Sequence, residues 1–172
     1  LFGFELMSNF KFPYFSRDIG EFWRRWHISL STWFRDYLYI PLGGSKGGKW
    51  LSIRNIFIIF IVSGFWHGAN WTFIMWGLIH AMLYIPLFLR GKNRQYTTAI
   101  VAEGKWLPSL KELFQMGSTF FFTMIAWVFF RINSVTDGFF YLLKIIKHID
   151  IPSVHRFGII FIILIIILDW IF

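Results

Sequence analysis

Two histidines in aromatic surroundings are the residues of this chain best suited to chemistry. His67 lies between Trp66 and Gly68, in a stretch between Arg54 and Arg90 that contains no Asp, Glu, Lys or Arg. An ionisable side chain inside a bilayer is costly and by default marks a functional site. Burial favours the neutral imidazole, which can take a proton from an incoming hydroxyl. We therefore predict that His67 is catalytic; the alternative is a histidine satisfied by a carbonyl of a neighbouring helix.

Polar and small residues beside His67 could complete such a site. The side-chain amide of Asn70 and the indole N–H of Trp66 could donate hydrogen bonds to a developing oxyanion. Gly64 and Gly68 would let a substrate approach the imidazole closely. These neighbours strengthen the prediction that His67 is catalytic.

The second histidine, His27, is predicted to lie on a helix within side-chain reach of Arg24 and Ser31. It could orient a donor thioester, and the alternative is a polar anchor at the membrane interface. Arg24, Arg25 and Arg35 could hold the phosphates of coenzyme A. Arginines in this setting more often contact lipid headgroups, so both roles stay open.

Several other kinds of site are poorly supported. The chain has no cysteine and no H-E-x-x-H motif, so we predict no metal site. It has no G-x-S-x-G elbow, and the glycine-rich loop at residues 43–49 lacks the spacing of a phosphate-binding P-loop. His80 has no glycine or polar neighbours like those of His67, and we interpret it as a core histidine that hydrogen-bonds between helices.

The composition indicates an integral membrane protein. Of 172 residues, 56% are hydrophobic and 15% are charged, and the mean hydropathy is +0.57. Average globular chains are about a quarter charged. The net charge of +8 comes from basic residues that flank apolar spans, which is typical of cytoplasmic loops rather than of nucleic-acid binding.

Residues 18–40 are predicted to form an amphipathic helix. Asp18 and Glu21 have the spacing of a capping box, and Pro41 ends the helix. Its polar side is basic, so we expect it to lie in the interface or to pack on other spans. Aromatic and leucine side chains recur at three and four residues along one face: Trp23, Trp26, Leu30, Trp33, Phe34 and Tyr37.

Residues 52–89 are predicted to form a broken transmembrane hairpin. One helix over this run would be roughly 50 Å long, whereas the hydrocarbon core is about 30 Å thick. The segment around His67 is the natural place for the break. Basic residues flank both ends of the hairpin, and the positive-inside rule places both ends in the cytoplasm.

The rest of the chain adds further helices. We predict a transmembrane helix at 112–131, an interfacial helix at 139–149 and a truncated transmembrane helix at 157–172. Both ends look cut, so we expect residues 1–172 to be a single, partial membrane domain of a longer protein. The predicted fold class is all-α, a polytopic transmembrane helical bundle with interfacial or re-entrant helices.

Long motifs carry a resemblance to a known family. Residues 22–44, from Phe22-Trp23-Arg24-Arg25-Trp26-His27 to Pro41-Leu42-Gly43-Gly44, resemble the signature of the membrane-bound O-acyltransferases, the MBOAT family. Residues 63–71, around Trp66-His67-Gly68, look like its second motif, and residues 127–131 look like a later segment. The bacterial alginate O-acetyltransferase branch is the most similar. The branch that transfers D-alanine to lipoteichoic acid shares the helix but usually lacks the Pro-Leu-Gly-Gly ending.

The resemblance implies a partial MBOAT fold in a multi-pass protein of the bacterial inner membrane. It implies transfer of an acetyl group from a cytoplasmic thioester such as acetyl-CoA to hydroxyls of an extracytoplasmic polysaccharide. No permanently bound cofactor is implied, and His67 and His27 would be the essential and the second motif histidine. Partners would be the lipid bilayer, the acyl donor and an acetyltransferase protein outside the membrane, with no nucleic acid.

Other functions stay open at this point. The acyl group could be D-alanyl or another acyl group delivered to a cell-wall polymer, and the acceptor could be alginate, cellulose or peptidoglycan. A transporter segment would use His67 as a relay and would release no free coenzyme A. A scaffold subunit that only docks a partner would tolerate the loss of His67.

Overall fold

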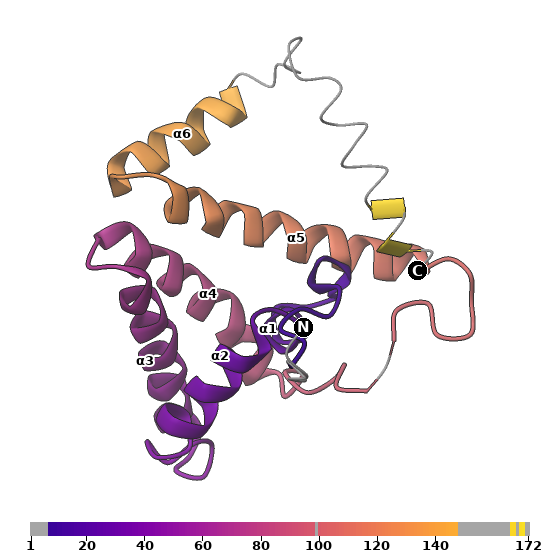
Figure 1. Cartoon of the computed structure of the whole chain (residues 1–172), viewed down its shortest axis with the longest axis horizontal. Coiled ribbons are helices and arrows are strands. Elements are labelled where there is room, and N and C mark those ends of the chain that lie inside the picture. Colours follow the sequence, from indigo (N-terminus) through magenta and orange to yellow (C-terminus); the bar gives the residue numbers. More distant parts are fainter. Residues whose placement is uncertain (1–6, 99, 148–165, 168, 171–172) are drawn as a thin grey trace, which may run out of the picture. The chain divides into compact units, whose positions relative to one another are not determined.

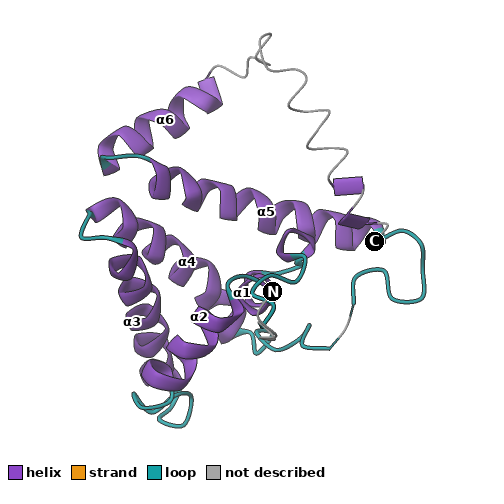
Figure 2. Cartoon of the chain, in the orientation of Figure 1, coloured by secondary structure: helices purple, strands orange, loops and turns teal. Residues whose placement is uncertain are grey.

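The computed structural model describes residues 7–98, 100–147, 166–167 and 169–170, and in these ranges it contains helices and loops but no strand (Figures 1 and 2). The predicted all-α class is confirmed. Among the described helices, three are long and apolar enough to cross a membrane: α3 (Lys49–His67), α4 (Trp71–Leu89) and α5 (Leu110–Arg131). The span expected at 157–172 lies almost wholly outside the described residues.

The helices α3 and α4 form a tight antiparallel hairpin whose turn is Gly68–Asn70 (Figure 1). Their backbones touch, because a Cβ added to Gly64 would lie 2.3 Å from the carbonyl oxygen of Phe73. Small residues permit this approach in membrane helices, where packing rather than water exclusion holds helices together. Ile56, Phe60 and Ala81 form the buried centre of the hairpin.

The helix expected at 18–40 is broken, which corrects the single-helix prediction. It consists of α1 (Ile19–Arg25), α2 (Ile28–Phe34) and a π-helical segment (Arg35–Tyr39). The N-terminal segment supplies hydrogen-bond acceptors at the break. The backbone carbonyl of Asn9 accepts from the N–H of Ile28 at 2.9 Å, and the side-chain oxygen of Asn9 accepts from the N–H of Ser29 at 3.0 Å. Asn9 thus satisfies donors that a continuous helix would have paired internally.

α5 begins two residues before the helix expected at 112–131 and ends with it at Arg131. Ser109 and Glu112 form a full capping box, in which each side chain accepts from the backbone N–H of the other residue. The helix then runs beside α4, with which it has extensive contacts (Figure 1). This packing brings the carboxyl end of α5, near Phe130, to the turn of the α3–α4 hairpin.

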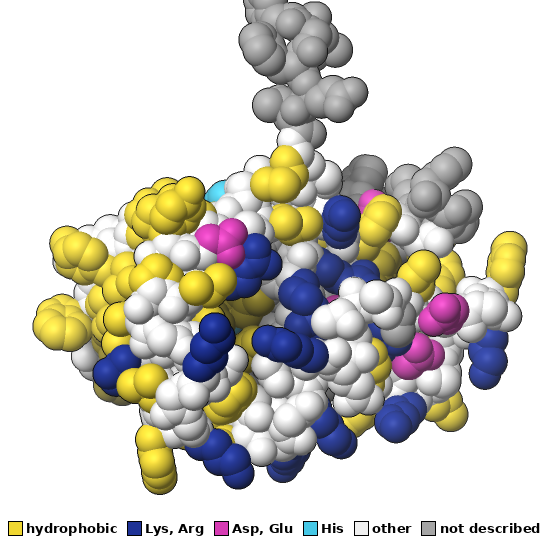
Figure 3. Space-filling view, turned by 90° about the horizontal axis from the view of Figure 1, so that it is seen from below, with side chains coloured by type: hydrophobic (Ala, Val, Ile, Leu, Met, Phe, Trp, Pro, Cys, Tyr) yellow, Lys and Arg dark blue, Asp and Glu magenta, His cyan; other side chains and the backbone are white. Residues whose placement is uncertain are grey.

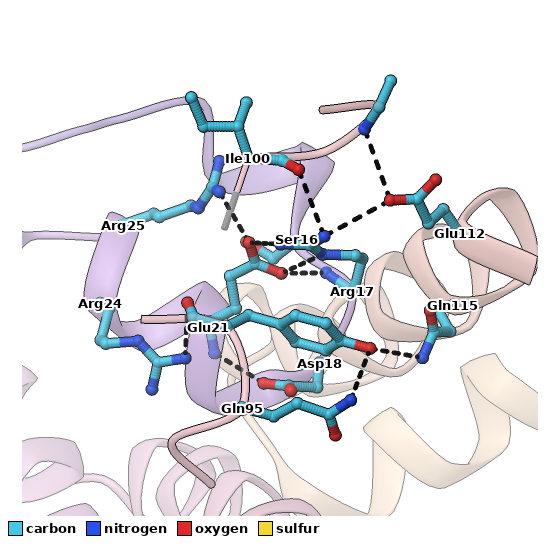
Figure 4. Close-up of polar contacts among 12 residues, drawn as sticks. Ser16, Arg17, Asp18, Glu21, Arg24, Arg25, Gln95, Ile100, Glu112 and Gln115 are labelled. Atoms are coloured by element: carbon cyan, nitrogen blue, oxygen red, sulfur yellow. Dashed lines mark hydrogen bonds and ion pairs between the residues drawn. The ribbon is translucent and has the colours of Figure 1, made fainter. Parts of the chain in front are cut away.

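A buried ionic cluster ties α1 to the start of α5 (Figure 4). The carboxylate of Glu21 accepts from the guanidinium groups of Arg17 at 3.0 Å and Arg25 at 2.6 Å. Arg17 also reaches Glu112 at 3.4 Å and lies 3.9 Å from the ring centre of Tyr96. Because Glu21 is fully buried, this pairing fixes the α1 helix against the rest of the fold.

Basic side chains gather on the face seen from below the view of Figure 1 (Figure 3). The residues that flank the hairpin are all exposed, and they belong to the segment before α3, to α3 itself and to the loop after α4: Lys46, Lys49, Arg54, Arg90, Lys92 and Arg94. This arrangement leaves the His67 turn at the opposite end of α3 from Lys49, about 28 Å away along the helix.

The last described helix, α6 (Val135–Lys147), belongs mostly to a second compact unit, residues 139–172. It begins four residues before the helix expected at 139–149. Lys144 and Lys147 lie in its last turn, whereas many of its apolar side chains are exposed within the described part of the chain. These features fit a helix that lies in a membrane interface.

Candidate active site

His67 ends α3 and is half-buried among aromatic rings. Its ring centre lies 4.8 Å from that of Phe130, 4.9 Å from Trp66 and 5.3 Å from Trp76, and all three meet it edge to face. Phe73 lies 6.3 Å away. Three membrane helices therefore build an apolar wall around one imidazole.

The two glycines beside His67 serve the hairpin, which corrects their predicted role in substrate approach. The backbone of Phe73 occupies the space beside Gly64, and a Cβ on Gly68 would lie 2.7 Å from the Phe73 ring. Gly68 also has φ +154°, a conformation that residues with side chains rarely adopt. Gly68 therefore permits the turn directly after His67, and this turn sets where the imidazole lies.

His27 lies at the break between α1 and α2 in the left-handed conformation, with φ 43° and ψ 57°. Such a conformation in a residue other than glycine is uncommon and costs energy, and strained residues cluster at functional sites. Its Nδ1 is buried and has no hydrogen-bond partner among the described residues. Its ring centre lies 6.1 Å from that of Phe10 in the N-terminal segment, and its predicted role toward the donor stays a prediction.

Asn70 and Trp66 flank the turn at His67. Asn70 caps α4, since its side-chain oxygen accepts from the N–H of Thr72 at 3.1 Å, and its amide donates to the carbonyl of Asn133 at 3.2 Å. Trp66 is 59% exposed and packs its ring against His67. Asn70 thus joins the turn to the segment after α5, and its predicted role toward an oxyanion stays a prediction.

Arg24 and Arg25 both have partners inside the protein. Arg24 donates to the backbone carbonyls of Asn93 at 2.8 Å and Tyr96 at 3.2 Å, which anchors the loop after α4 (Figure 4). Arg25 pairs with the buried Glu21. Both guanidinium groups therefore hold the fold together in this structure, and contact with a donor's phosphates stays a prediction.

Ser31 and Arg35 lie further along the same segment. The hydroxyl of Ser31 donates to the carbonyl of Trp26 at 3.1 Å, which helps to close the helix after the break. Arg35 is exposed and pairs with Asp36 at 2.7 Å, and this hydrogen bond holds the pKa of the Asp36 carboxyl below its usual value. The predicted role of Arg35 toward a donor's phosphates stays a prediction.

The structure adds Trp76 and Phe130 to the surroundings of His67, which the sequence had not identified. Phe130 lies in the motif at 127–131, so that motif was the available signal. His80 is fully buried, as expected of a core residue, but the predicted helix–helix hydrogen bond is absent from the described residues. In the described ranges no three His, Asp or Glu side chains gather to hold a metal ion.

Comparison with known proteins identifies the motifs on which these histidines lie. The sequence profile of MBOAT, the membrane-bound O-acyltransferase family, matches residues 1–87, which contain both histidines. The chain belongs to the MBOAT family. With three helices long enough to span a bilayer, this MBOAT chain is a multi-pass membrane protein.

Individual bacterial relatives are similar over most of this MBOAT chain. A probable alginate O-acetylase, AlgI, of Pseudomonas syringae pv. tomato is 46% identical over 132 residues, which cover 76% of this chain and 23% of the relative. A peptidoglycan O-acetyltransferase of Helicobacter pylori is 39% identical over 85% of this chain and 25% of its own length. A teichoic acid D-alanyltransferase of Bacillus subtilis is 37% identical over 63% of this chain and 28% of its length. The chain thus spans about a quarter of the length of these relatives.

Proposed function

We propose that this protein is a membrane O-acyltransferase that moves an acetyl group from a cytoplasmic thioester, acetyl-CoA, to hydroxyls of an extracytoplasmic polysaccharide. The observation that carries the proposal is the half-buried imidazole of His67 at the end of α3, which aromatic rings of three membrane helices surround. Family membership supports the reaction class.

His67 acts as the general base of this reaction. Its imidazole takes the proton of an acceptor hydroxyl, and the resulting alkoxide oxygen bonds to the carbonyl carbon of the thioester. The carbon–sulfur bond then breaks, and protonated His67 gives its proton to the thiolate of coenzyme A as it leaves. The aromatic rings around the imidazole exclude water, which would otherwise hydrolyse the thioester.

The acetyl group is favoured over D-alanine by the pattern of similarity. The relatives named for O-acetylation are 39–46% identical and align with 76–85% of the chain, whereas the Bacillus subtilis D-alanyltransferase aligns with 63%. The acceptor is an alginate-type polysaccharide by the same reasoning. Peptidoglycan is the runner-up, because the Helicobacter pylori relative covers the largest share of the chain among these three.

The exposed basic end of the hairpin faces the cytoplasm of a bacterial inner membrane. Lys46, Lys49, Lys92 and Arg94 would meet the anionic lipids of that leaflet and the phosphates of the donor. The opposite end exposes Trp66 and, at 78%, Trp71. Exposed tryptophans suit a membrane–water interface, where an extracytoplasmic acetyltransferase partner would receive or guide the acetyl group.

The test is substitution of His67 in the gene as it occurs in the cell. We expect His67→Ala and His67→Gln to abolish O-acetylation of the polysaccharide while membrane levels of the protein stay normal. In isolated membranes the same variants should release no free coenzyme A from acetyl-CoA. Leu89→Ala is the control: it shortens an exposed side chain at the far end of α4, and acetylation should persist. Full acetylation by His67→Ala would refute the proposal, and wild-type membranes without thioester turnover would favour a transporter.

A further inference from the structure

His80 is the most deeply buried ionisable side chain near the site that the proposed mechanism does not use. Its exposed fraction is 0%, and neither ring nitrogen has a hydrogen-bond partner among the described residues. The imidazole lies nearly parallel to the rings of Phe22 and Phe60, at interplanar angles of 5° and 20°. A phenylalanine would suit such an apolar slot without leaving polar atoms unpaired.

Two tryptophans whose indole nitrogens also lack a hydrogen-bond partner among the described residues lie against His80. Trp23 and Trp76 meet its ring edge to face at 5.0 Å and 4.9 Å, and the two indoles lie 5.8 Å from each other. The three rings therefore form a closed triangle. Both indole nitrogens are buried and have no partner in the described part of the chain. Four buried nitrogens on three rings in contact thus have no partner among the described residues, although buried polar groups are nearly always hydrogen-bonded.

The chemistry of these nitrogens is complementary to a single small molecule. Each indole N–H can only donate, whereas a neutral imidazole donates from one nitrogen and accepts at the other. A molecule that pairs with all three rings must therefore both accept and donate hydrogen bonds. Water meets this requirement, and buried waters typically make about three such bonds.

Trp76 connects this triangle to the proposed base. Its ring meets His80 at 4.9 Å and His67 at 5.3 Å, edge to face in both cases. Trp76 is 3% exposed and also touches Phe130, so it has little freedom to move independently of its neighbours. Whatever fixes the plane of Trp76 therefore fixes one wall of the His67 site.

We propose that Trp23, Trp76 and His80 form a buried hydrogen-bonding site for one water molecule, and that His80, through this site and Trp76, is a positioning residue for His67. This inference rests on the proposed function. The water ties the edge of Trp76 to His80, which holds the indole plane against the imidazole of His67. Loss of these water-mediated hydrogen bonds leaves the fold intact but lets the imidazole of His67 move from its position. Small displacements of reacting groups lower the rate by large factors.

The decisive variant is His80→Phe, because it keeps a planar ring in an aromatic slot and removes both nitrogens. If His80 only fills space, this variant is at least as stable as the native protein and fully active. We expect instead an unchanged or higher Tm together with a kcat for acetyl transfer that falls about tenfold to a hundredfold. The KM for acetyl-CoA should stay the same.

Rescue separates positioning from packing. His80→Asn and His80→Gln place an amide near the positions of the two ring nitrogens, and at least one of them should recover a substantial part of kcat. Trp76→Phe should lower kcat to a similar extent, and the double variant with His80→Phe should be no slower than either single variant. If His80→Phe fails to reach the membrane, Trp76→Phe and the two amide variants carry the test.

The control variant lies on the same helix as His80. Tyr84→Phe removes one polar atom one turn along α4 from His80, beside the same Phe60 ring, and should leave kcat unchanged. Native kcat in His80→Phe, or a loss of kcat that neither amide recovers, overturns this inference. An inactive His67→Ala beside a fully active His80→Phe leaves the proposed function standing, whereas an active His67→Ala removes the basis of both.

Discussion

Gly77 of α4 lies directly against the carbonyl oxygen of Phe60 on α3, so that a Cβ built on Gly77 would be 2.2 Å from this oxygen. Gly64 has the reciprocal relationship with Phe73. The two contacts lie one helical turn apart along each helix. The backbones of α3 and α4 therefore touch at two successive turns. The position of His67 depends on these contacts, because His67 lies one turn beyond Gly64 on α3.

The substitution Gly77→Ala should therefore push α3 and α4 apart. A backbone atom cannot move aside as a flexible side chain can, so we expect Gly77→Ala to destabilise the protein by about 1–3 kcal/mol or more. Thermal unfolding in detergent measures the change, and acetylation in cells should fall with it. Gly117→Ala is the matched control, since Gly117 lies within α5 and a Cβ there would meet nothing within 4 Å. That variant should be neutral or slightly stabilising.

Glu21 should be the most sensitive charged residue of the described structure. Glu21→Gln keeps the shape of the side chain but leaves the buried Arg17 without the carboxylate that it contacts through two nitrogens. Removing one partner of a buried ion pair typically costs about 3–5 kcal/mol. Asp36→Asn breaks the exposed pair with Arg35 and should change the Tm far less, because solvent screens that pair. Equal shifts in Tm for the two variants would show that Glu21 does not anchor α1.

The stability of the protein should depend on pH through Asp18. Burial raises the pKa of its carboxyl, although the N–H of Glu21 donates to it at 2.7 Å and counteracts the shift. A folded-state pKa above the unfolded one means that the folded state binds the proton more tightly. This contribution to stability is complete below the unfolded pKa and is lost as the pH rises through the folded pKa.

Asp18→Asn tests this sign. The amide oxygen keeps the capping hydrogen bond to Glu21 and removes the charge that burial penalises. We expect the variant to gain stability over the native protein at neutral pH and to lose that advantage as the pH falls through the raised pKa of Asp18, with the loss complete below about 4. Thermal unfolding across this range measures the difference. An advantage that grows toward acid pH would contradict the assignment.

The membrane helices could be predicted from the sequence because the bilayer demands long uncharged runs, and these stand out without any tertiary information. The turn after His67 was visible for the same reason, since an unbroken run would exceed the membrane thickness. The break at His27 was not visible, because Trp26 and Leu30 continue the helical pattern across it. What stabilises the break is Asn9, which lies on a different segment.

The surroundings of His67 were only partly predictable. Trp66 and Asn70 adjoin it in the sequence, whereas Trp76 and Phe130 reach it from other parts of the chain through helix packing. The role of Gly64 was misread, because a glycine beside a reactive residue looks the same whether it admits a substrate or a neighbouring backbone. Only the contact with Phe73 distinguishes the two. Arg24 shows the same ambiguity, since the carbonyls to which it donates, those of Asn93 and Tyr96, lie in the loop after α4, outside the motif.

The conformation of His27 gives a way to separate its backbone from its imidazole. Asparagine tolerates the left-handed region better than other residues with a side chain, apart from aspartate, so His27→Asn should fold with a Tm close to the native value. If the imidazole takes part in acyl transfer, this variant loses most acetylation even though the break between α1 and α2 persists. His27→Val, which is β-branched and poorly suited to positive φ, should lose stability as well. Acetylation and Tm measured together decide the matter: a fully active His27→Asn would show that the position needs its backbone shape and not its ring.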